Sequence, residues 1–134
     1  MADQTEIYRR AQRFFQTYDI LITPTVGVSP WPKHEVYPAK VNGKPMANYF
    51  EYVGLTYGIT LLNHPAISIP CGVDHAGMPF GIQLVGRRNE DLKLMHVACA
   101  LEEVLARNPL TARPVPDIAA LGAVTVRDEM EPVA

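Results

Sequence analysis

The sequence predicts an α/β fold in which a small β-sheet is flanked by helices, and three observations predict it. Residues 5–18 and 89–107 carry apolar side chains at the three- and four-residue spacing of amphipathic helices. Short apolar runs at 20–22, 66–70 and 79–86 have the composition of buried strands and are bounded by proline or glycine. The chain has 134 residues, which is enough for a single domain with its own core.

The first helix and the first strand follow each other directly. The helix is predicted over 5–18 because its apolar side chains share one face while its arginines lie elsewhere. The run 20–22 is expected to be a buried strand that ends at Pro24, since proline has no N–H to donate to a neighbouring strand. The apolar face of the helix consists of Ile7, Ala11, Phe14, Phe15 and Tyr18.

A long loop separates this strand from the next helical segment. Prolines and glycines throughout 25–45 exclude regular structure, and Asn42 is typical of a turn. A loop of this length in a compact domain usually has a function. Residues 46–62 are expected to be helical in part, because Gly54 and Gly58 lower their helix propensity.

The second and third strands are predicted to form a hairpin, and a long helix follows it. The turn of the hairpin is expected at 74–77. Asn89 is the expected N-cap of the last helix, which should extend to about Arg107, before a proline. Residues 1–109 are therefore expected to form the folded segment, and residues 110–134, which show no periodicity, an extended or disordered tail.

The composition excludes several classes of function. The formal net charge is −2 and no basic cluster exceeds the pair 87–88, so neither nucleic acid nor a membrane is an expected partner. The N-terminus does not resemble a signal peptide, and no apolar run is long enough to span a bilayer. The chain has two cysteines, Cys71 and Cys99, which we expect to be reduced thiols in the cytoplasm.

Cys71 lies near two histidines in the sequence, which raises the hypothesis of a cysteine nucleophile. Such a site needs a partly exposed thiolate next to a base, here His64 or His75. Cys71 stands between Pro70 and Gly72 at the end of a strand, where a small apolar residue packed against its neighbours is the more ordinary interpretation. An independent enzyme that uses Cys71 is an alternative that thiol reactivity would decide.

The other polar side chains form no recognisable site. No two histidines have the spacing of metal ligands and no CxxC motif is present, so no metal and no cofactor are expected. Neither serine, Ser29 or Ser68, stands in a G-x-S-x-G motif, and no catalytic residue is assigned to this chain. The histidines considered are His34, His64, His75 and His96.

Three motifs stand in a fixed order along the chain. They are D-x-L-x-T-P-T at 19–25, P-A-I-S-x-P-C-G at 65–72 and G-x-P-x-G-x-Q-L-V-G at 77–86. In this order they resemble the C-terminal part of the amidase signature family, and the resemblance extends over about residues 8–107. That family hydrolyses or transfers carboxamide C–N bonds and includes simple amidases and the amidase subunit of the glutamyl-tRNA amidotransferase. The resemblance implies an α/β fold in which this chain is the C-terminal piece, a partial mixed β-sheet flanked by helices.

The resemblance also implies what this chain lacks. The family mechanism uses a serine nucleophile, a second serine in a cis peptide and a lysine base, on a glycine- and serine-rich stretch in the N-terminal and central part. This sequence has no such stretch, and no lysine stands in a matching context, neither Lys33, Lys40, Lys44 nor Lys93. The implied role is an amidase segment that supplies scaffold and one wall of the acyl pocket and is inactive alone. The wall residues that it implies are Trp31, Tyr49, Val53 and Thr56.

Two departures from the family pattern affect the turn and the substrate. Where family members usually carry Asn and Gly before the P-A-I-S motif, this chain has Thr60 and Asn63, and asparagine tolerates the left-handed backbone of such a turn. Relatives that use glutamine carry an acid at the position of Val53, so a neutral or apolar amide is the implied substrate.

The uncovered strands and helices of such a segment predict its partners. We expect self-association or a chain that carries the missing N-terminal part, because either would bury apolar surface and strand edges. The alternative is a non-catalytic module, derived from an amidase, that oligomerises or binds a ligand or a protein.

Overall fold

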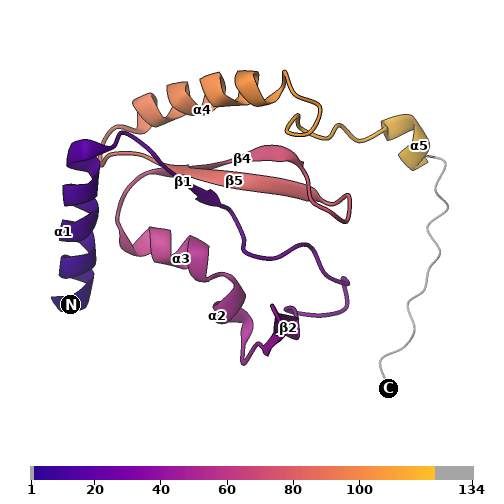
Figure 1. Cartoon of the computed structure of the whole chain (residues 1–134), viewed down its shortest axis with the longest axis horizontal. Coiled ribbons are helices and arrows are strands. Elements are labelled where there is room, and N and C mark those ends of the chain that lie inside the picture. Colours follow the sequence, from indigo (N-terminus) through magenta and orange to yellow (C-terminus); the bar gives the residue numbers. More distant parts are fainter. Residues whose placement is uncertain (1, 123–134) are drawn as a thin grey trace.

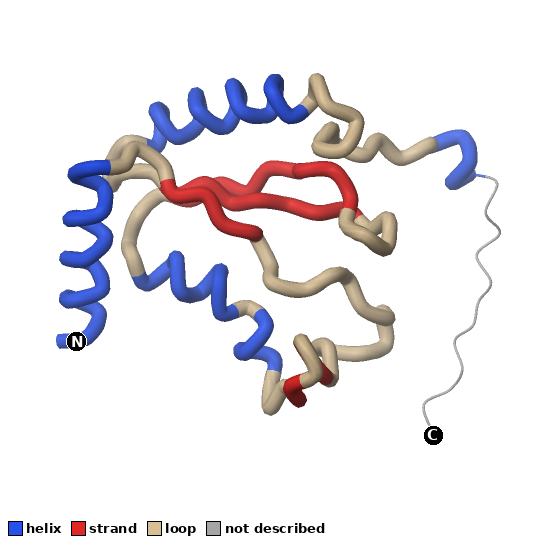
Figure 2. Tube along the Cα trace, viewed as in Figure 1, coloured by secondary structure: helices blue, strands red, loops and turns tan. Residues whose placement is uncertain are grey.

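The computed structural model describes residues 2–122, and its architecture is α/β, as the sequence predicts (Figure 1). The elements in chain order are α1 (Ala2–Thr17), β1 (Leu21–Pro24), β2 (Lys40–Val41), β3 (Lys44–Pro45), α2 (Tyr49–Tyr52), α3 (Gly54–Leu61), β4 (Ala66–Val73), β5 (Pro79–Val85), α4 (Asp91–Leu105) and α5 (Ile118–Gly122). The main sheet lies between α4 on one side and α3 on the other, and α1 stands at one end of the sheet (Figure 2).

The main sheet has three strands in the order β1, β5, β4, and both pairings are antiparallel. Ile69 pairs with Ile82, and Ile67 pairs with Leu84. Because side chains alternate between the two faces of a strand, these four apolar residues share one face of the sheet. β1 and β4 are the outer strands, so within residues 2–122 each has one edge without a partner strand.

Helix α4 covers the apolar face of the sheet. Leu94 and Ala98 form the buried core with Ile69 and Leu84, and Leu84 is 0% exposed. Gly86, directly after β5, allows the helix to come close, because a Cβ at this position would lie 3.2 Å from Cβ of Leu94. The amphipathic pattern predicted for the last helix is therefore confirmed.

The beginning of α4 differs from the sequence prediction. Asn89 is not the N-cap: its φ is 62°, in the left-handed region, and the N-cap is Glu90, whose side chain makes no capping bond. Asparagine adopts this conformation at lower cost than most residues, so Asn89 turns the chain from β5 into α4. The helix ends at Leu105, slightly before the predicted end at Arg107.

The first half contains regular structure that its composition did not predict. Within 25–45, where regular structure was excluded, β2 and β3 pair around Asn42 and Gly43, whose φ angles are 50° and 78°. Two left-handed residues in succession make a tight hairpin turn, so the turn expected at Asn42 is confirmed. The helical segment expected within 46–62 is divided into α2 and α3, which meet at Val53.

Asp74 closes the hairpin between β4 and β5 at the predicted place. Its Oδ1 accepts hydrogen bonds from the backbone N–H groups of Ala76 at 2.8 Å and Met78 at 2.9 Å. Gly77 completes the turn with a φ of 75°. Before β4, Asn63 has a φ of 56°, in agreement with the left-handed turn expected there.

The last part of the chain contains α5, which the sequence did not predict. α5 lies within 110–134, where an extended or disordered tail is predicted, and the remainder of that range, 123–134, lies outside the described residues. Among the helices of residues 2–122, none combines the length and the apolar content needed to cross a membrane.

Candidate functional site

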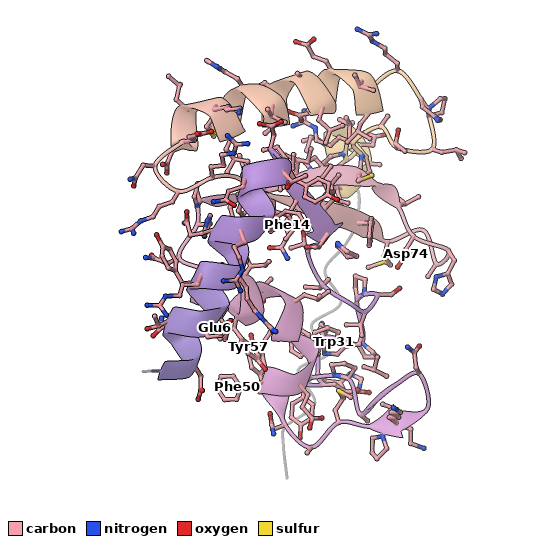
Figure 3. All side chains as sticks on the ribbon, turned by 60° about the vertical axis from the view of Figure 1, so that its left-hand side comes forward. Glu6, Phe14, Trp31, Phe50, Tyr57 and Asp74 are labelled. Atoms are coloured by element: carbon pink, nitrogen blue, oxygen red, sulfur yellow. The ribbon has the colours of Figure 1, made fainter. Side chains whose placement is uncertain are left out.

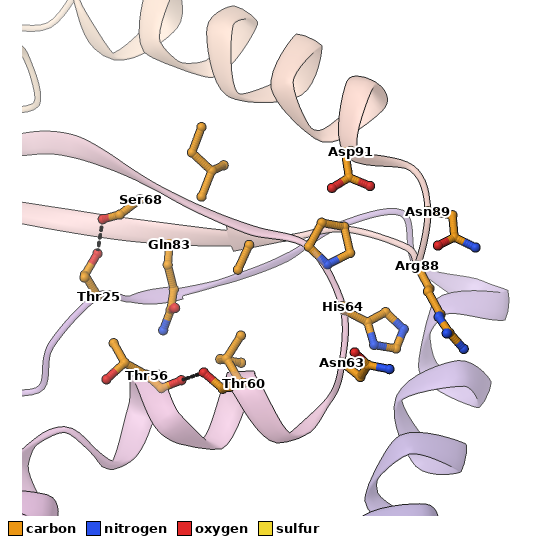
Figure 4. Close-up of a pocket in the computed structure, with 14 residues that line it drawn as sticks. Thr25, Thr56, Thr60, Asn63, His64, Ser68, Gln83, Arg88, Asn89 and Asp91 are labelled. Carbon is orange, nitrogen blue, oxygen red and sulfur yellow. Dashed lines mark hydrogen bonds between the residues drawn. The ribbon is translucent and has the colours of Figure 1, made fainter.

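Two cavities contain predicted wall residues in their lining, Thr56 in one and Trp31 in the other. The larger of the two has a volume of about 700 Å³ and lies between α3 and the face of the sheet that α4 does not cover (Figure 4). Three polar side chains of the sheet line this cavity. Ser68 lies in β4, Gln83 lies in β5, and Thr25 directly follows the end of β1. Ser68 and Gln83 are register partners, which places both on the face opposite Ile69 and Leu84.

The polar groups of this cavity are held by short hydrogen bonds. The Thr25 and Ser68 hydroxyl oxygens lie 2.6 Å apart, and the Gln83 side-chain N–H donates to the Pro24 carbonyl oxygen at 3.2 Å. Gln83 is only 6% exposed, so this hydrogen bond is needed to offset the burial of its amide. The sheet side of the cavity therefore presents neutral donors and acceptors in fixed positions, and Arg88 and Asp91 add charged groups elsewhere in its lining.

Helix α3 forms the opposite side of the cavity and contributes two further hydroxyl groups to its lining. Thr56 donates to the Val53 carbonyl oxygen at 2.8 Å, and Thr60 donates to the Thr56 carbonyl oxygen at 3.2 Å. Both threonines line the cavity, and Figure 4 shows them across from Gln83. Their oxygens keep lone pairs free to accept a hydrogen bond from a molecule in the cavity.

His64 lies at one end of this cavity and connects the sheet to α1. Its Nδ1 lies 2.6 Å from the Leu62 carbonyl oxygen, and its Nε2 lies 3.2 Å from the Gln12 side-chain nitrogen. The imidazole also stacks on Phe15, with ring centroids 4.9 Å apart. Both ring nitrogens therefore have partners other than Cys71, and the contacts of His64 are those of a structural residue.

A smaller cavity, of about 450 Å³, lies between the loop after β1 and the end of the β4–β5 hairpin. Trp31, Tyr52 and Phe80 supply aromatic surface to it. The Trp31 and Tyr52 rings meet edge to face, with centroids 4.8 Å apart. Asp74 also lines this cavity and brings a carboxylate to it.

The structure divides the four predicted wall residues between these two places. Thr56 lines the larger cavity and Trp31 lines the smaller one. Tyr49 contacts the ring of Tyr52, with centroids 5.0 Å apart, and Val53 accepts the Thr56 hydrogen bond through its backbone. A single wall made by all four residues stays a prediction.

Sequence reasoning missed the three polar residues of the sheet face as a group. Thr25, Ser68 and Gln83 each stand in one of the three motifs, but the motifs alone do not predict a shared site for them. The alternation of Ser68 and Gln83 with isoleucine and leucine is the signal that they share a face. Only the strand register shows that they meet Thr25 in one cavity.

Neither cysteine is paired with another cysteine, and metal ligands do not gather in the described part of the chain. Cys71 is half-buried and Cys99 is exposed, both as free thiols. Within residues 2–122, no group of three or more histidine, cysteine, aspartate or glutamate side chains is placed to hold a metal ion.

An ion-pair cluster fixes the start of β1 to the start of α4. The Lys93 ammonium lies 2.8 Å from Oδ1 of Asp19, and the Arg87 guanidinium lies 3.4 Å from the same oxygen. The hydrogen bond from Lys93 is the main cause of a lowered pKa for Asp19 and of a raised pKa for Lys93. The lysine therefore serves a structural contact here.

The amidase family model matches residues 1–95. The chain is 36% identical over 111 residues to a subunit of the glutamyl-tRNA(Gln) amidotransferase of Synechococcus sp. (strain CC9902), a match that covers 83% of this chain and 21% of that protein. It is 30% identical over 91 residues to an acylamidase of Rhodococcus erythropolis, covering 68% of this chain and 19% of that protein.

Solved structures show the same likeness in the fold. The corresponding subunit of the glutamyl-tRNA(Gln) amidotransferase of Thermotoga maritima superposes with a TM-score of 0.65 and 27% identity, over 84% of this chain and 23% of that chain. A 6-aminohexanoate cyclic dimer hydrolase superposes with a TM-score of 0.61 and 28% identity, over 81% of this chain and 24% of that chain. The chain thus spans about a fifth of the length of the curated relatives, 21% of the Synechococcus protein, and it belongs to the amidase family.

Proposed function

We propose that this chain serves as the C-terminal segment of an amidase that cleaves a carboxamide C–N bond, supplying scaffold and part of the substrate pocket. The observation that carries the proposal is the convergence of the three motifs on one cavity. Thr25, Ser68 and Gln83 come from segments far apart in the sequence, yet each lines the same polar space. An amide needs both a donor and an acceptor opposite it, and hydroxyl and carboxamide side chains offer both.

The same geometry argues that the chain does not supply its own nucleophile. A serine is a weak nucleophile unless a base is within hydrogen-bond reach. In the described residues the Ser68 hydroxyl contacts Thr25 and the Ile82 carbonyl oxygen, and no lysine or histidine bonds to it. Lys93 is held by Asp19. The serines and the lysine of the family mechanism would then come from another part of the enzyme.

A graft tests the proposal. The matching segment of the Rhodococcus erythropolis acylamidase is replaced with residues 1–109 of this chain, and hydrolysis of an acyl amide is measured. The expected result is measurable hydrolysis by the graft and none by the acylamidase from which the segment has been deleted. A graft that has the parent's size and circular dichroism but no activity would overturn the proposal.

A matched pair of substitutions in the graft tests the polar cavity itself. Gln83→Leu keeps the volume of the side chain but removes its amide, and it should reduce the rate of hydrolysis. Glu103→Gln changes an exposed residue of α4, away from the cavity, and should leave the rate unchanged. Equal rates for the two variants would count against a role for this cavity.

A second candidate function is a non-catalytic module that self-associates, and one observation favours it. Leu55, Tyr57 and Leu61 of α3 are exposed, and the outer edges of β1 and β4 have no partner strand within residues 2–122. Exposed strand edges and apolar helix faces favour association. Light scattering on the purified chain should show a dimer or larger species. A monomer at all concentrations would contradict this candidate.

The state of the two cysteines is the ground for a proposal about the cellular location of the protein. Cys71 and Cys99 are both unpaired, which agrees with a reducing environment. We propose a cytoplasmic location on this ground.

A further inference from the structure

The smaller cavity has an aromatic wall that is fixed in place before any ligand arrives. The Trp31 indole N–H donates to the Glu35 carbonyl oxygen at 2.8 Å, and the Glu35 N–H donates to the Pro32 carbonyl oxygen at 3.0 Å. Tyr52 meets Trp31 edge to face at 4.8 Å between centroids. An aromatic wall held in one orientation costs little further entropy when a ligand binds.

The cavity also contains the carboxylate of Asp74, one oxygen of which has no backbone donor. Oδ1 of Asp74 accepts the backbone hydrogen bonds of the hairpin turn, whereas Oδ2 is buried and receives no backbone hydrogen bond within residues 2–122. A side-chain hydrogen bond from Ser29, and then the Met78 N–H, lower the pKa of Asp74, so the group is anionic at neutral pH. One hydroxyl donor leaves much of the charge of a carboxylate oxygen that is shielded from water uncompensated, and a nearby cation would offset that charge.

We propose that this cavity binds an organic ammonium ion, with the cation between Asp74 and the rings of Trp31 and Tyr52. Asp74, Trp31 and Tyr52 all line this one cavity, and Figure 3 labels Asp74 and Trp31 on its separate walls. A cation is attracted both to a carboxylate and to the face of an aromatic ring, and tryptophan is the strongest of the aromatic side chains in this respect. A volume of about 450 Å³ suits a ligand as small as a quaternary amine.

The other charged residues at this cavity leave its preference for a cation in place. Lys33 and Glu35 both line the cavity and both are exposed, so their opposite charges offset each other and are screened by water. Asp74 is half-buried and is therefore the charge of this lining that water screens least. The inference goes beyond the proposed function, since binding at this cavity requires no amide cleavage.

Trp31 makes the test direct because it is the only tryptophan of the chain. The purified chain is titrated with choline and, separately, with 3,3-dimethyl-1-butanol, a neutral alcohol of the same shape, at constant ionic strength. Indole fluorescence is recorded in both titrations. Choline should give a saturable change, and the neutral alcohol should bind at least about ten-fold more weakly. Equal affinities for the two compounds would overturn the proposal.

Two variants assign the binding to named groups. Asp74→Asn keeps an oxygen that can accept the turn's hydrogen bonds but removes the charge, and it should weaken choline binding by about ten-fold or more. Glu103→Gln, which makes the same change of charge on the exposed surface of α4, should bind choline as the unmodified chain does. An unchanged affinity of Asp74→Asn would refute the role of the carboxylate.

A third variant keeps the proposal testable if Asp74→Asn fails to fold. Tyr52→Leu removes an aromatic ring that takes no part in the hairpin turn, and it should weaken choline binding several-fold. Choline binding by Tyr52→Leu equal to that of the unmodified chain would contradict the aromatic wall. No amide is present in these titrations, so their failure would leave the proposed function untouched.

Discussion

Replacement of Gly72 by alanine should destabilise the fold through two separate effects. Gly72 lies at the end of β4 with a φ of 68°, in the region that residues with a Cβ rarely adopt. A Cβ at this position would also overlap the carbonyl oxygen of Leu110, on the segment that follows α4. That oxygen belongs to the backbone, so no side-chain rotation can make room for the new atom.

The size of the effect follows from these two terms. The left-handed backbone costs an alanine about 1–2 kcal/mol, and a forced shift in a packed region costs about 1–3 kcal/mol. Alanine also lowers the entropy of the unfolded chain, which offsets about 0.4–1 kcal/mol of that cost. The free energy of unfolding of Gly72→Ala should therefore decrease by about 1–4.5 kcal/mol, as measured by urea unfolding followed by circular dichroism.

Gly77 provides the matched control. Its φ is 75°, close to that of Gly72, but a Cβ there would have no heavy atom within 4 Å. Gly77→Ala should therefore show only the cost of the backbone conformation, about 1 kcal/mol after the entropy term. If the two variants agree within about 0.5 kcal/mol, the overlap with Leu110 does not exist in solution and the predicted steric cost is wrong.

Two further variants test the core and the ion-pair cluster. Leu94→Ala should lower the free energy of unfolding by about 2–5 kcal/mol, because Leu94 is 3% exposed and fills the space over Gly86. Asp19→Asn should remove the part of the pH dependence of the free energy of unfolding that the Asp19 carboxylate causes. The lowered pKa of Asp19 means that its contribution is present above pH 3.8 and is lost as the pH falls through the lower pKa of the folded state. A loss under about 1 kcal/mol for Leu94→Ala would mean that α4 does not pack on the sheet as described. For Asp19→Asn, the measurement is urea unfolding between about pH 5 and pH 2. If the free energy of unfolding falls with pH equally in Asp19→Asn and in the unmodified chain, Lys93 and Asp19 do not interact in solution.

The elements with a clear apolar period could be predicted from the sequence. The stripe of α4 and the hairpin of β4 and β5 follow from local spacing, and both are present. Asn89 was misassigned because asparagine is favoured both at an N-cap and in the left-handed region, and only the path of the chain from β5 decides between them. The ladder of β2 and β3 is too short to show a period.

The candidate site could be predicted only in its parts. Trp31 and Thr56 were both expected at a wall, but the fold places them at different cavities because their distance depends on how the loop after β1 crosses the molecule. Thr25 and Ser68 are 43 positions apart in the sequence, and their hydroxyls come within 2.6 Å only through the pairing of β1 and β4 with β5. No local pattern contains that information.

Whether the chain can cleave an amide by itself is decided by the release of ammonia from a simple aliphatic amide and from an aromatic amide. The purified chain is assayed beside its Cys71→Ala and Ser68→Ala variants, with an active amidase as the positive control. We expect no release by any of the three, because no base in the described residues hydrogen-bonds to the Ser68 hydroxyl, and both ring nitrogens of His64 have partners other than Cys71. Release by the unmodified chain that disappears in one variant would contradict the proposed role as a segment without a nucleophile and would identify that residue as the nucleophile.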